Sequence, residues 1–277
     1  FQSLTCAKNI FINGNEDLKI INSFSSIVQL LGDSWGLRIT ENSALESISG
    51  FQSLENTKNI IFDNNAGSGA PNSLPTFPSL RSADYIYLTQ LTMPENYTAF
   101  NNLIQINDLK IESLRNLKHL KGFNKIQSTK NLWIDNNLNL ETIEGFENLK
   151  LINGSFKLSN NIKLFEVNAF KSAEYVENAF WLLNNSLTNF DFLKNLNNVS
   201  SDNSDIFIQA MPSVQDCSGL SNLLKYGNIS NIINVSTGAV GCNTRADIEA
   251  AADTDKDGIL DVDDLDDDND GLSDLEE

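Results

Sequence analysis

Phenylalanine recurs along this chain at nearly constant intervals, and this repeat limits the possible folds more than any other feature. Such regular self-similarity indicates stacked structural units, because one unit is too small to bury its own apolar residues. The sequence therefore predicts about ten repeat units over residues 1–245. Eight of the sixteen phenylalanines mark the pattern, and they are Phe1, Phe24, Phe51, Phe77, Phe100, Phe123, Phe146 and Phe170.

Each unit holds a short segment in which apolar and variable residues alternate. In the unit that opens at Phe123, this segment is Leu132–Ile134, and the pair Asn136–Asn137 follows it. Alternation with a period of two predicts a β-strand whose flanking residues point inward and whose central residue points outward. A unit of about 23 residues leaves little room for a crossover helix with its loops. We therefore expect a mainly β fold, a parallel β-solenoid with one such strand per turn, stacked about 4.8 Å apart.

The asparagine pair recurs after the strand segment in several units, including Asn64–Asn65, Asn160–Asn161 and Asn184–Asn185. Asparagine tolerates a left-handed backbone, and its amide both donates and accepts hydrogen bonds. We expect these pairs to lie at a corner of the solenoid, where each amide bonds its equivalent in the next turn.

The recurring pattern Phe-x-x-Leu, Leu-x-Ile, Asn-Asn-x-x-Leu and Ile-x-Gly-Phe resembles receptor L-domain repeats. These are leucine-rich-repeat relatives found in growth-factor receptor ectodomains and in bacterial surface proteins. The resemblance covers residues 1–245 and implies a right-handed solenoid that binds ligands rather than catalysing a reaction. Residues 217–224 and 241–243 also resemble the closing cap of the bacterial versions.

The three cysteines suggest a bond within this cap. Cys217 and Cys242 both lie in the presumed terminal turn, and we hypothesise that they form a disulfide in an oxidising environment. The alternative is a pair of buried thiols. Cys6 is left over, either as a core residue or as the partner of a cysteine upstream of this chain.

Residues 253–277 contain two twelve-residue segments with acidic residues at positions 1, 3, 5, 9 and 12 and glycine at position 6. Carboxylates at alternate positions, a carbonyl at position 7 and a glycine for the sharp turn form the oxygen cage that calcium needs. We therefore expect calcium as the cofactor. The predicted ligands are Asp253, Asp255, Asp257, Ile259, Asp261 and Asp264 in the first segment and Asp266, Asp268, Asp270, Leu272, Asp274 and Glu277 in the second.

Two other interpretations of the tail explain less. A disordered acidic tail is the ordinary meaning of a run of charge, but it does not account for the regular spacing and both glycines. EF-hands need long helices beside each loop, and only one residue separates these two segments. The tail instead resembles thrombospondin type 3 repeats, which are calcium-wrapped linkers in extracellular proteins, although it lacks their cysteines. We expect residues 246–252 to be a short linker and residues 253–277 to be tandem calcium-binding repeats.

The charge distribution agrees with a metal-dependent tail outside the cell. Residues 253–277 hold 13 acidic residues and one lysine, a net charge of −12 out of −18 for the chain. Without metal such a segment is expected to be an extended coil, and with metal the binding energy becomes folding energy. The acidity argues against nucleic acid or an anionic membrane as partner. No apolar run is long enough to predict a membrane-spanning helix, so we expect no membrane insertion.

The sequence offers little support for an enzyme. His119 is the only histidine, and no glycine-rich phosphate loop is present. Asp108, Glu112 and Asp135 could serve a carbohydrate-active β-helix enzyme, but acids are commonplace on solvated strands. We therefore expect a non-enzymatic protein.

The central residues of the strand segments are expected to form one outward column. Aromatic rings beside carboxylates can stack on sugar rings or hold peptide side chains, which makes part of this column a candidate ligand-binding face. The alternatives are an aromatic–lysine ladder that only shields the sheet and a surface covered by a neighbouring domain. The column reads Phe11, Arg38, Ile61, Tyr87, Lys110, Trp133, Lys157, Trp181, Phe207 and Ile233, and the candidate face is Tyr87, Lys110, Trp133, Lys157, Trp181 and Phe207.

These features favour a cell-surface recognition or adhesion module with a calcium-stabilised linker or stalk, located outside a cell or on the outer surface of a bacterium. Its expected partners are a cell-surface glycan or protein ligand, or neighbouring domains or subunits of a larger surface protein. The chain opens at Phe1 in the middle of the pattern, so we expect a fragment of a longer protein. The alternative is an architectural segment of a surface filament or large adhesin with no ligand of its own.

Overall fold

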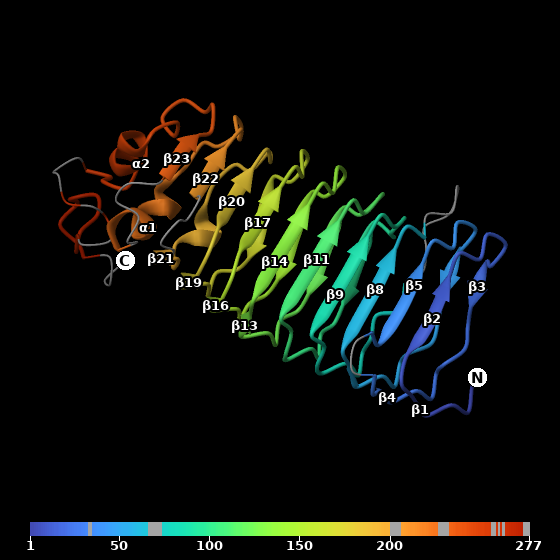
Figure 1. The fold of residues 1–277 in the computed structure, drawn as a ribbon. Coiled ribbons are helices and arrows are strands. Elements are labelled where there is room, and N and C mark those ends of the chain that lie inside the picture. Colours follow the sequence, from blue (N-terminus) through green and yellow to red (C-terminus); the bar gives the residue numbers. More distant parts are fainter. Residues whose placement is uncertain are drawn as a thin grey trace.

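The structure is a computed structural model, and it describes residues 1–32, 35–65, 74–199, 206–226, 233–255, 259, 261 and 264–273. These residues form a mainly β solenoid of about nine turns with parallel sheets and two short α-helices (Figure 1). The predicted fold class is confirmed. About ten units were expected, and the largest sheet has ten strands, which are separated by about nine turns of chain.

The largest sheet runs the length of the solenoid and takes one strand from each turn (Figure 1). Its strands pair in parallel, and each pairs with its equivalent one repeat unit further along the chain. In order, the strands are β2 (Ile10–Asn13), β5 (Leu37–Thr40), β8 (Asn59–Asp63), β9 (Tyr85–Thr89), β11 (Asp108–Glu112), β14 (Asn131–Asp135), β17 (Phe156–Ser159), β20 (Phe180–Leu183), β22 (Ile206–Gln209) and β23 (Ile233–Ser236).

Shorter strands from the same turns form four further parallel sheets. Two of these sheets hold β10 (Asn96–Ala99), β12 (His119–Gly122), β15 (Thr142–Gly145) and β18 (Glu166–Ala169), and β3 (Ile20–Ile21) with β6 (Ser47–Ile48). The other two hold β13 (Ser128–Thr129), β16 (Leu151–Ile152), β19 (Tyr175–Val176) and β21 (Asn198–Val199), and β1 (Cys6–Ala7), β4 (Gln29–Leu30) and β7 (Asn56–Thr57). A turn thus contributes up to three strands that surround a shared interior.

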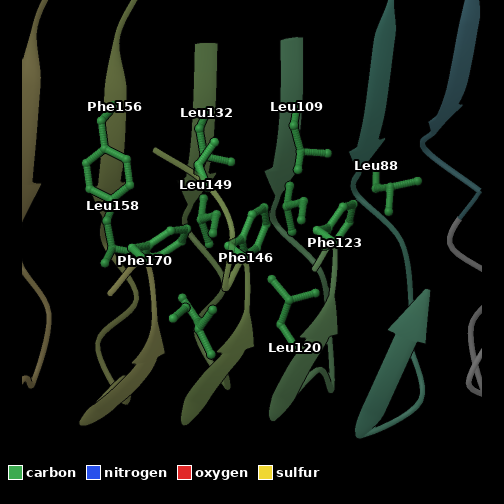
Figure 2. Packing of buried hydrophobic residues seen from close by; sticks show 14 of the residues in the cluster. Leu88, Leu109, Leu120, Phe123, Leu132, Phe146, Leu149, Phe156, Leu158 and Phe170 are labelled. Atoms are coloured by element: carbon green, nitrogen blue, oxygen red, sulfur yellow. The ribbon is translucent and has the colours of Figure 1, made fainter. Parts of the chain in front are cut away.

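The recurring phenylalanines stack on one another inside the solenoid. The ring of Phe146 lies 4.8 Å from that of Phe123 and 4.9 Å from that of Phe170, and Figure 2 shows these three rings in a row. All three rings are buried. Each phenylalanine has a left-handed backbone, with φ between 53° and 61°, which bulky residues rarely adopt. Burial of the Phe146 ring between the equivalent rings of the two neighbouring turns stabilises this conformation.

A glycine before the phenylalanine lets the turns approach closely. Gly145 has a φ of +117°, and a Cβ atom built there would lie 2.0 Å from the carbonyl oxygen of Gly122 in the preceding turn. Only a residue without a side chain fits this position. Gly50 and Gly122 have the same positive φ before their phenylalanines, whereas Ala99 and Ala169 stand at the equivalent position of neighbouring turns without it. Glycine is therefore a steric requirement only in the turns that adopt this backbone.

The asparagine pairs form the expected ladder at a corner beside the largest sheet. The first asparagine of a pair is left-handed, as at Asn136 and Asn160, with φ of 56° and 55°. The second is buried, and the Asn137 amide donates to Asn161 Oδ1 at 3.2 Å. Asn161 repeats the same contact with Asn185. The ladder satisfies buried polar groups that the apolar interior cannot.

Four short helices close the C-terminal end of the described solenoid (Figure 1). They are η1 (Asp191–Leu193), η2 (Ser218–Leu220), α1 (Ser221–Tyr226) and α2 (Arg245–Ala251). Helix α2 occupies most of the segment expected to be a linker. Thr244 begins it with a capping box that includes Asp247, and its Ile248 side chain is buried against the core.

Candidate functional site

The largest sheet brings the outward column together. Strand register places Lys110 between Tyr87 and Trp133, and places Lys157 between Trp133 and Trp181. Phe207 follows Trp181 on the next strand. The six residues of the candidate ligand face therefore lie on six neighbouring strands, from β9 to β22, and all six are partly exposed.

One residue of the expected column is wrong. The strand partner of Phe207 on β23 is Asn234, whereas Ile233 pairs with Ile206, which is buried in the interior. Residues 231–235 read Asn-Ile-Ile-Asn-Val, so their apolar residues fit two frames of alternation. A shift of one residue exchanges the two faces of a strand, and the sequence alone did not fix the frame here.

Lys157 is the centre of a small network on this face. Its Nζ lies 2.7 Å from Asp135 Oδ2 on the neighbouring strand and 5.9 Å from the centre of the Trp181 ring. Asp135 Oδ1 also accepts hydrogen bonds from Ser159 Oγ at 2.6 Å and Asn160 Nδ2 at 3.0 Å. Burial alone would raise the pKa of Asp135, but these three donors and the Lys157 charge outweigh it and hold the pKa below its usual value.

The second lysine of the face is paired in a similar way. Lys110 Nζ lies 2.6 Å from Glu112 Oε2 on its own strand. The nearby Asp108 accepts a hydrogen bond from Asn131 Nδ2 at 2.8 Å. The three carboxylates considered for catalysis, Asp108, Glu112 and Asp135, thus lie on the outward face, each bonded to a neighbouring side chain.

The two tryptophans of the face turn their polar edges away from solvent. The Nε1 atoms of Trp133 and Trp181 are shielded and have no hydrogen-bond partner among the described residues. Both side chains are nevertheless partly exposed. What the indoles present to solvent is therefore carbon surface.

Tyrosines extend the face toward the N-terminal turns. The rings of Tyr85 and Tyr87, on one strand, lie 6.0 Å apart. Burial raises the pKa of the Tyr87 hydroxyl, and the Asp108 charge and Tyr85 raise it further. The Tyr87 phenol is therefore neutral over the physiological range.

A second aromatic group lies in the first turns and was missed in the sequence. Trp35 is 47% exposed, and its ring lies 6.2 Å from Phe11 and 5.8 Å from the guanidinium of Arg38. Trp35 stands three residues before Arg38, outside the apolar-x-apolar segment that was used to choose the column. The only sequence signal for Trp35 was its position just before the strand segment of its turn.

The acidic tail brings together three of the predicted calcium ligands. Oxygen atoms of Asp266, Asp268 and Asp270 all lie within 4.8 Å of one another. Ligands held about 2.3–2.6 Å from one calcium ion cannot be more than about 5 Å apart, so the spacing of these three carboxylates is compatible with one such ion. The backbone favours the arrangement, because Asp266 accepts the N–H groups of Asp270 and Gly271 at 3.0 and 2.9 Å.

The first acidic segment has a different set of contacts. Asp261 accepts the backbone N–H of Thr254 at 2.7 Å, and Asp264 accepts that of Leu265 at 2.7 Å. Asp255 contacts the side chain of Asn269, which joins the two segments. No group of three acids comparable to Asp266, Asp268 and Asp270 occurs elsewhere in the described part of the chain. The predicted ligands Asp257, Asp274 and Glu277 lie outside the described residues.

The cap of the solenoid contains a disulfide. Cys217 and Cys242 are joined, with their Cα atoms 5.9 Å apart, and both are buried. Cys6 is an exposed free thiol on β1. The disulfide ties the segment before η2 to the segment before α2.

A polar hollow lies on a different side of the solenoid. It measures about 460 Å³, and the ion pair of Lys150 and Glu174, 2.9 Å long, forms part of its wall with Asn222. Nothing in the sequence pattern pointed to it.

Comparison of the chain with known protein families, with curated proteins and with solved structures finds no match. Among the described residues, no helix is long and apolar enough to cross a bilayer.

Proposed function

We propose that this chain is a non-enzymatic recognition or adhesion module of a cell surface. The outward column from Tyr87 to Phe207 carries the proposal. Six partly exposed aromatic and lysine side chains lie in line on neighbouring strands, although the core does not need them there. An apolar surface that folding does not require is typical of a binding site.

The contacts of the carboxylates support binding rather than catalysis. Asp135 is held ionised by Lys157, and Glu112 is paired with Lys110. A general acid–base pair needs one carboxyl group whose pKa is raised, and the direction at Asp135 is the opposite. In this proposal the solenoid is an L-domain-like member of the leucine-rich-repeat relatives, located outside the cell.

We propose that the tail binds calcium and forms a linker or stalk that resembles thrombospondin type 3 repeats. Asp266, Asp268 and Asp270 would hold the ion, which would neutralise the repulsion among closely spaced carboxylates and so stiffen the segment. Extracellular calcium modules bind at about 10⁻⁴–10⁻³ M, a range suited to the outside of a cell.

The test is a glycan and peptide array probed with the whole chain, followed by the variants Trp133→Ala and Trp181→Ala. If the chain is a recognition module, the parent should bind specific ligands on the array, and both variants should fail to bind them. Tyr175→Ala is the matched control, because Tyr175 is a partly exposed aromatic residue of β19 in another sheet. Equal array binding by the parent and both tryptophan variants would exclude the column as the ligand face.

The second candidate is an architectural segment of a surface filament. The Lys157 network favours it, because Asp135, Lys157 and Trp181 link three successive turns and so stabilise the sheet without any ligand. Such a segment associates with copies of itself. Sedimentation velocity distinguishes the two, since a recognition module without ligand stays at one mass over a wide range of protein concentration.

A further inference from the structure

The charges of the candidate face are already satisfied within the protein. Lys110 is paired with Glu112 at 2.6 Å, and Lys157 with Asp135 at 2.7 Å. With Asp108 included, this stretch holds two lysines and three acids. An anionic ligand would have to displace an acid from each lysine, and a cationic ligand would have to displace each lysine. An uncharged ligand costs neither exchange.

The surface that remains between these ion pairs is aromatic. Trp133 and Trp181 present carbon, because their Nε1 atoms are shielded from solvent. The Lys157 ammonium group lies beside Asp135 and against the Trp181 ring, which holds that ring in position. Fixed rings with exposed carbon suit ligands that combine C–H faces with hydroxyl groups at their edges, and sugar rings have this character.

The spacing of the aromatic rings indicates the repeat distance of the ligand. Tyr87, Trp133 and Trp181 lie on every second strand, with a lysine strand between each pair. Strands about 4.8 Å apart place these rings about 9.6 Å apart along the solenoid axis. In an extended β-1,4-linked chain every second sugar presents the same face, and that repeat is close to this distance.

We propose that the column from Tyr87 to Trp181 binds one extended, uncharged β-1,4-linked polysaccharide that runs along the solenoid axis. Tyr87, Trp133 and Trp181 each contact one sugar, so that together they contact every second sugar of the chain. The polar side chains beside them, among them Asp108 and Glu112, contact its hydroxyl groups. This inference rests on the proposed recognition function and names the class of its ligand.

The experiment is isothermal titration calorimetry of the whole chain with cellohexaose and with N-acetyl-chitohexaose. We expect binding to at least one of them, and we expect it to weaken from hexasaccharide to disaccharide because a short chain spans fewer rings. Trp133→Ala and Trp181→Ala should each weaken binding about three- to tenfold. Trp133→Phe should restore most of the loss, and Tyr175→Ala should bind like the parent.

Two further measurements separate failure of the ligand class from failure of the site. Thermal unfolding of each variant shows that a loss of binding is not a loss of fold. Oligogalacturonate is the anionic comparison. If it binds the column more tightly than both neutral hexasaccharides, or if only a peptide from the array depends on Trp133 and Trp181, the polysaccharide class is wrong and the recognition function stands. If neither substitution changes binding of any ligand, both proposals are wrong.

Discussion

Asn161 accepts hydrogen bonds from both the backbone and the side-chain amide of Asn137, the equivalent residue one turn earlier. Its Oδ1 lies 3.0 Å from the backbone nitrogen of Asn137 and 3.2 Å from the side-chain nitrogen. Its own Nδ2 donates to the Ile134 carbonyl at 3.0 Å. Because the site is fully buried, water cannot replace these partners.

The variant Asn161→Ala should lower the free energy of unfolding by about 3 kcal/mol or more, because it leaves several buried polar groups unpaired at about 1–3 kcal/mol each. Urea unfolding measures the change. Asn148→Ala is the control, because Asn148 also bonds the preceding turn, through the Asn124 carbonyl, but is exposed. A similar loss of unfolding free energy in both variants would show that burial does not strengthen the contribution of the asparagine ladder.

Phe123→Ala should cost about 3–5 kcal/mol of stability, because it opens a cavity between the rings of Phe100 and Phe146. Phe165 provides the comparison, since it is 44% exposed and its replacement by alanine should cost under about 1 kcal/mol. Chemical denaturation of both variants tests the difference. A small effect at Phe123 would mean that the stack rearranges to fill the space.

Replacing Cys217 and Cys242 together by serine should destabilise the cap by about 3 kcal/mol, the cost expected for a bond between cysteines whose sequence separation is 25. Reductant should have the same effect on the parent and no effect on the double variant. The exposed Cys6 supplies the control, because Cys6→Ser should leave the unfolding curve unchanged. Reductant-independent stability of the parent would contradict this prediction.

Acidification should weaken the Asp135 network. The pKa of Asp135 is lowered in the folded protein, so its contribution is complete above the unfolded value of about 3.9 and is lost as the pH falls through the folded value. The free energy of unfolding of the parent should exceed that of Asp135→Asn at pH 7, and the difference should shrink as the pH falls below about 4. Urea unfolding at pH 7, 4 and 3 checks this, with the exposed Glu147→Gln as control. A gap that grows toward low pH would show that the sign is wrong.

Calcium titration of the whole chain should give binding in the range of about 10⁻⁴–10⁻³ M, reversed by EGTA. Replacing Asp266, Asp268 and Asp270 by asparagine should remove the contribution of the second segment, because it removes three clustered carboxylates. Calorimetry measures it. Glu147→Gln changes charge far along the chain from this cluster and should bind like the parent. Unchanged heats in the triple variant would exclude the cluster as the calcium site.

The regular part of this fold is predictable because its rules are local and repeated. The spacing from Phe123 to Phe146 and the alternation at Leu132–Ile134 each fix a stacking position and a face, and the neighbouring turns repeat the same choice. Prediction was harder where repetition weakens. At Ile233 three apolar residues fit two frames, and at residues 246–252 no period signalled the helix α2.

The candidate site was predictable only as far as register. Sequence placed Trp133, Lys157 and Trp181 on one line, but not the ion pair of Lys157 with Asp135 or the shielding of the indole nitrogens. These depend on side-chain rotamers across strands, which have no sequence period. Trp35 was missed for a related reason, since it reaches Phe11 and Arg38 from outside the repeating segment.

The matching of each turn to the next, ring on ring at Phe123 and Phe146 and amide on amide at Asn137 and Asn161, gives the molecule an adjustable length. Duplication or deletion of one whole unit leaves the two neighbours with equivalent surfaces to join, whereas a change of half a unit leaves buried rings and amides unmatched. Each added or removed unit therefore lengthens or shortens the exposed row of side chains on the long sheet by one strand spacing, about 4.8 Å. The length of this surface can change during evolution by whole units while the packing of the interior stays the same.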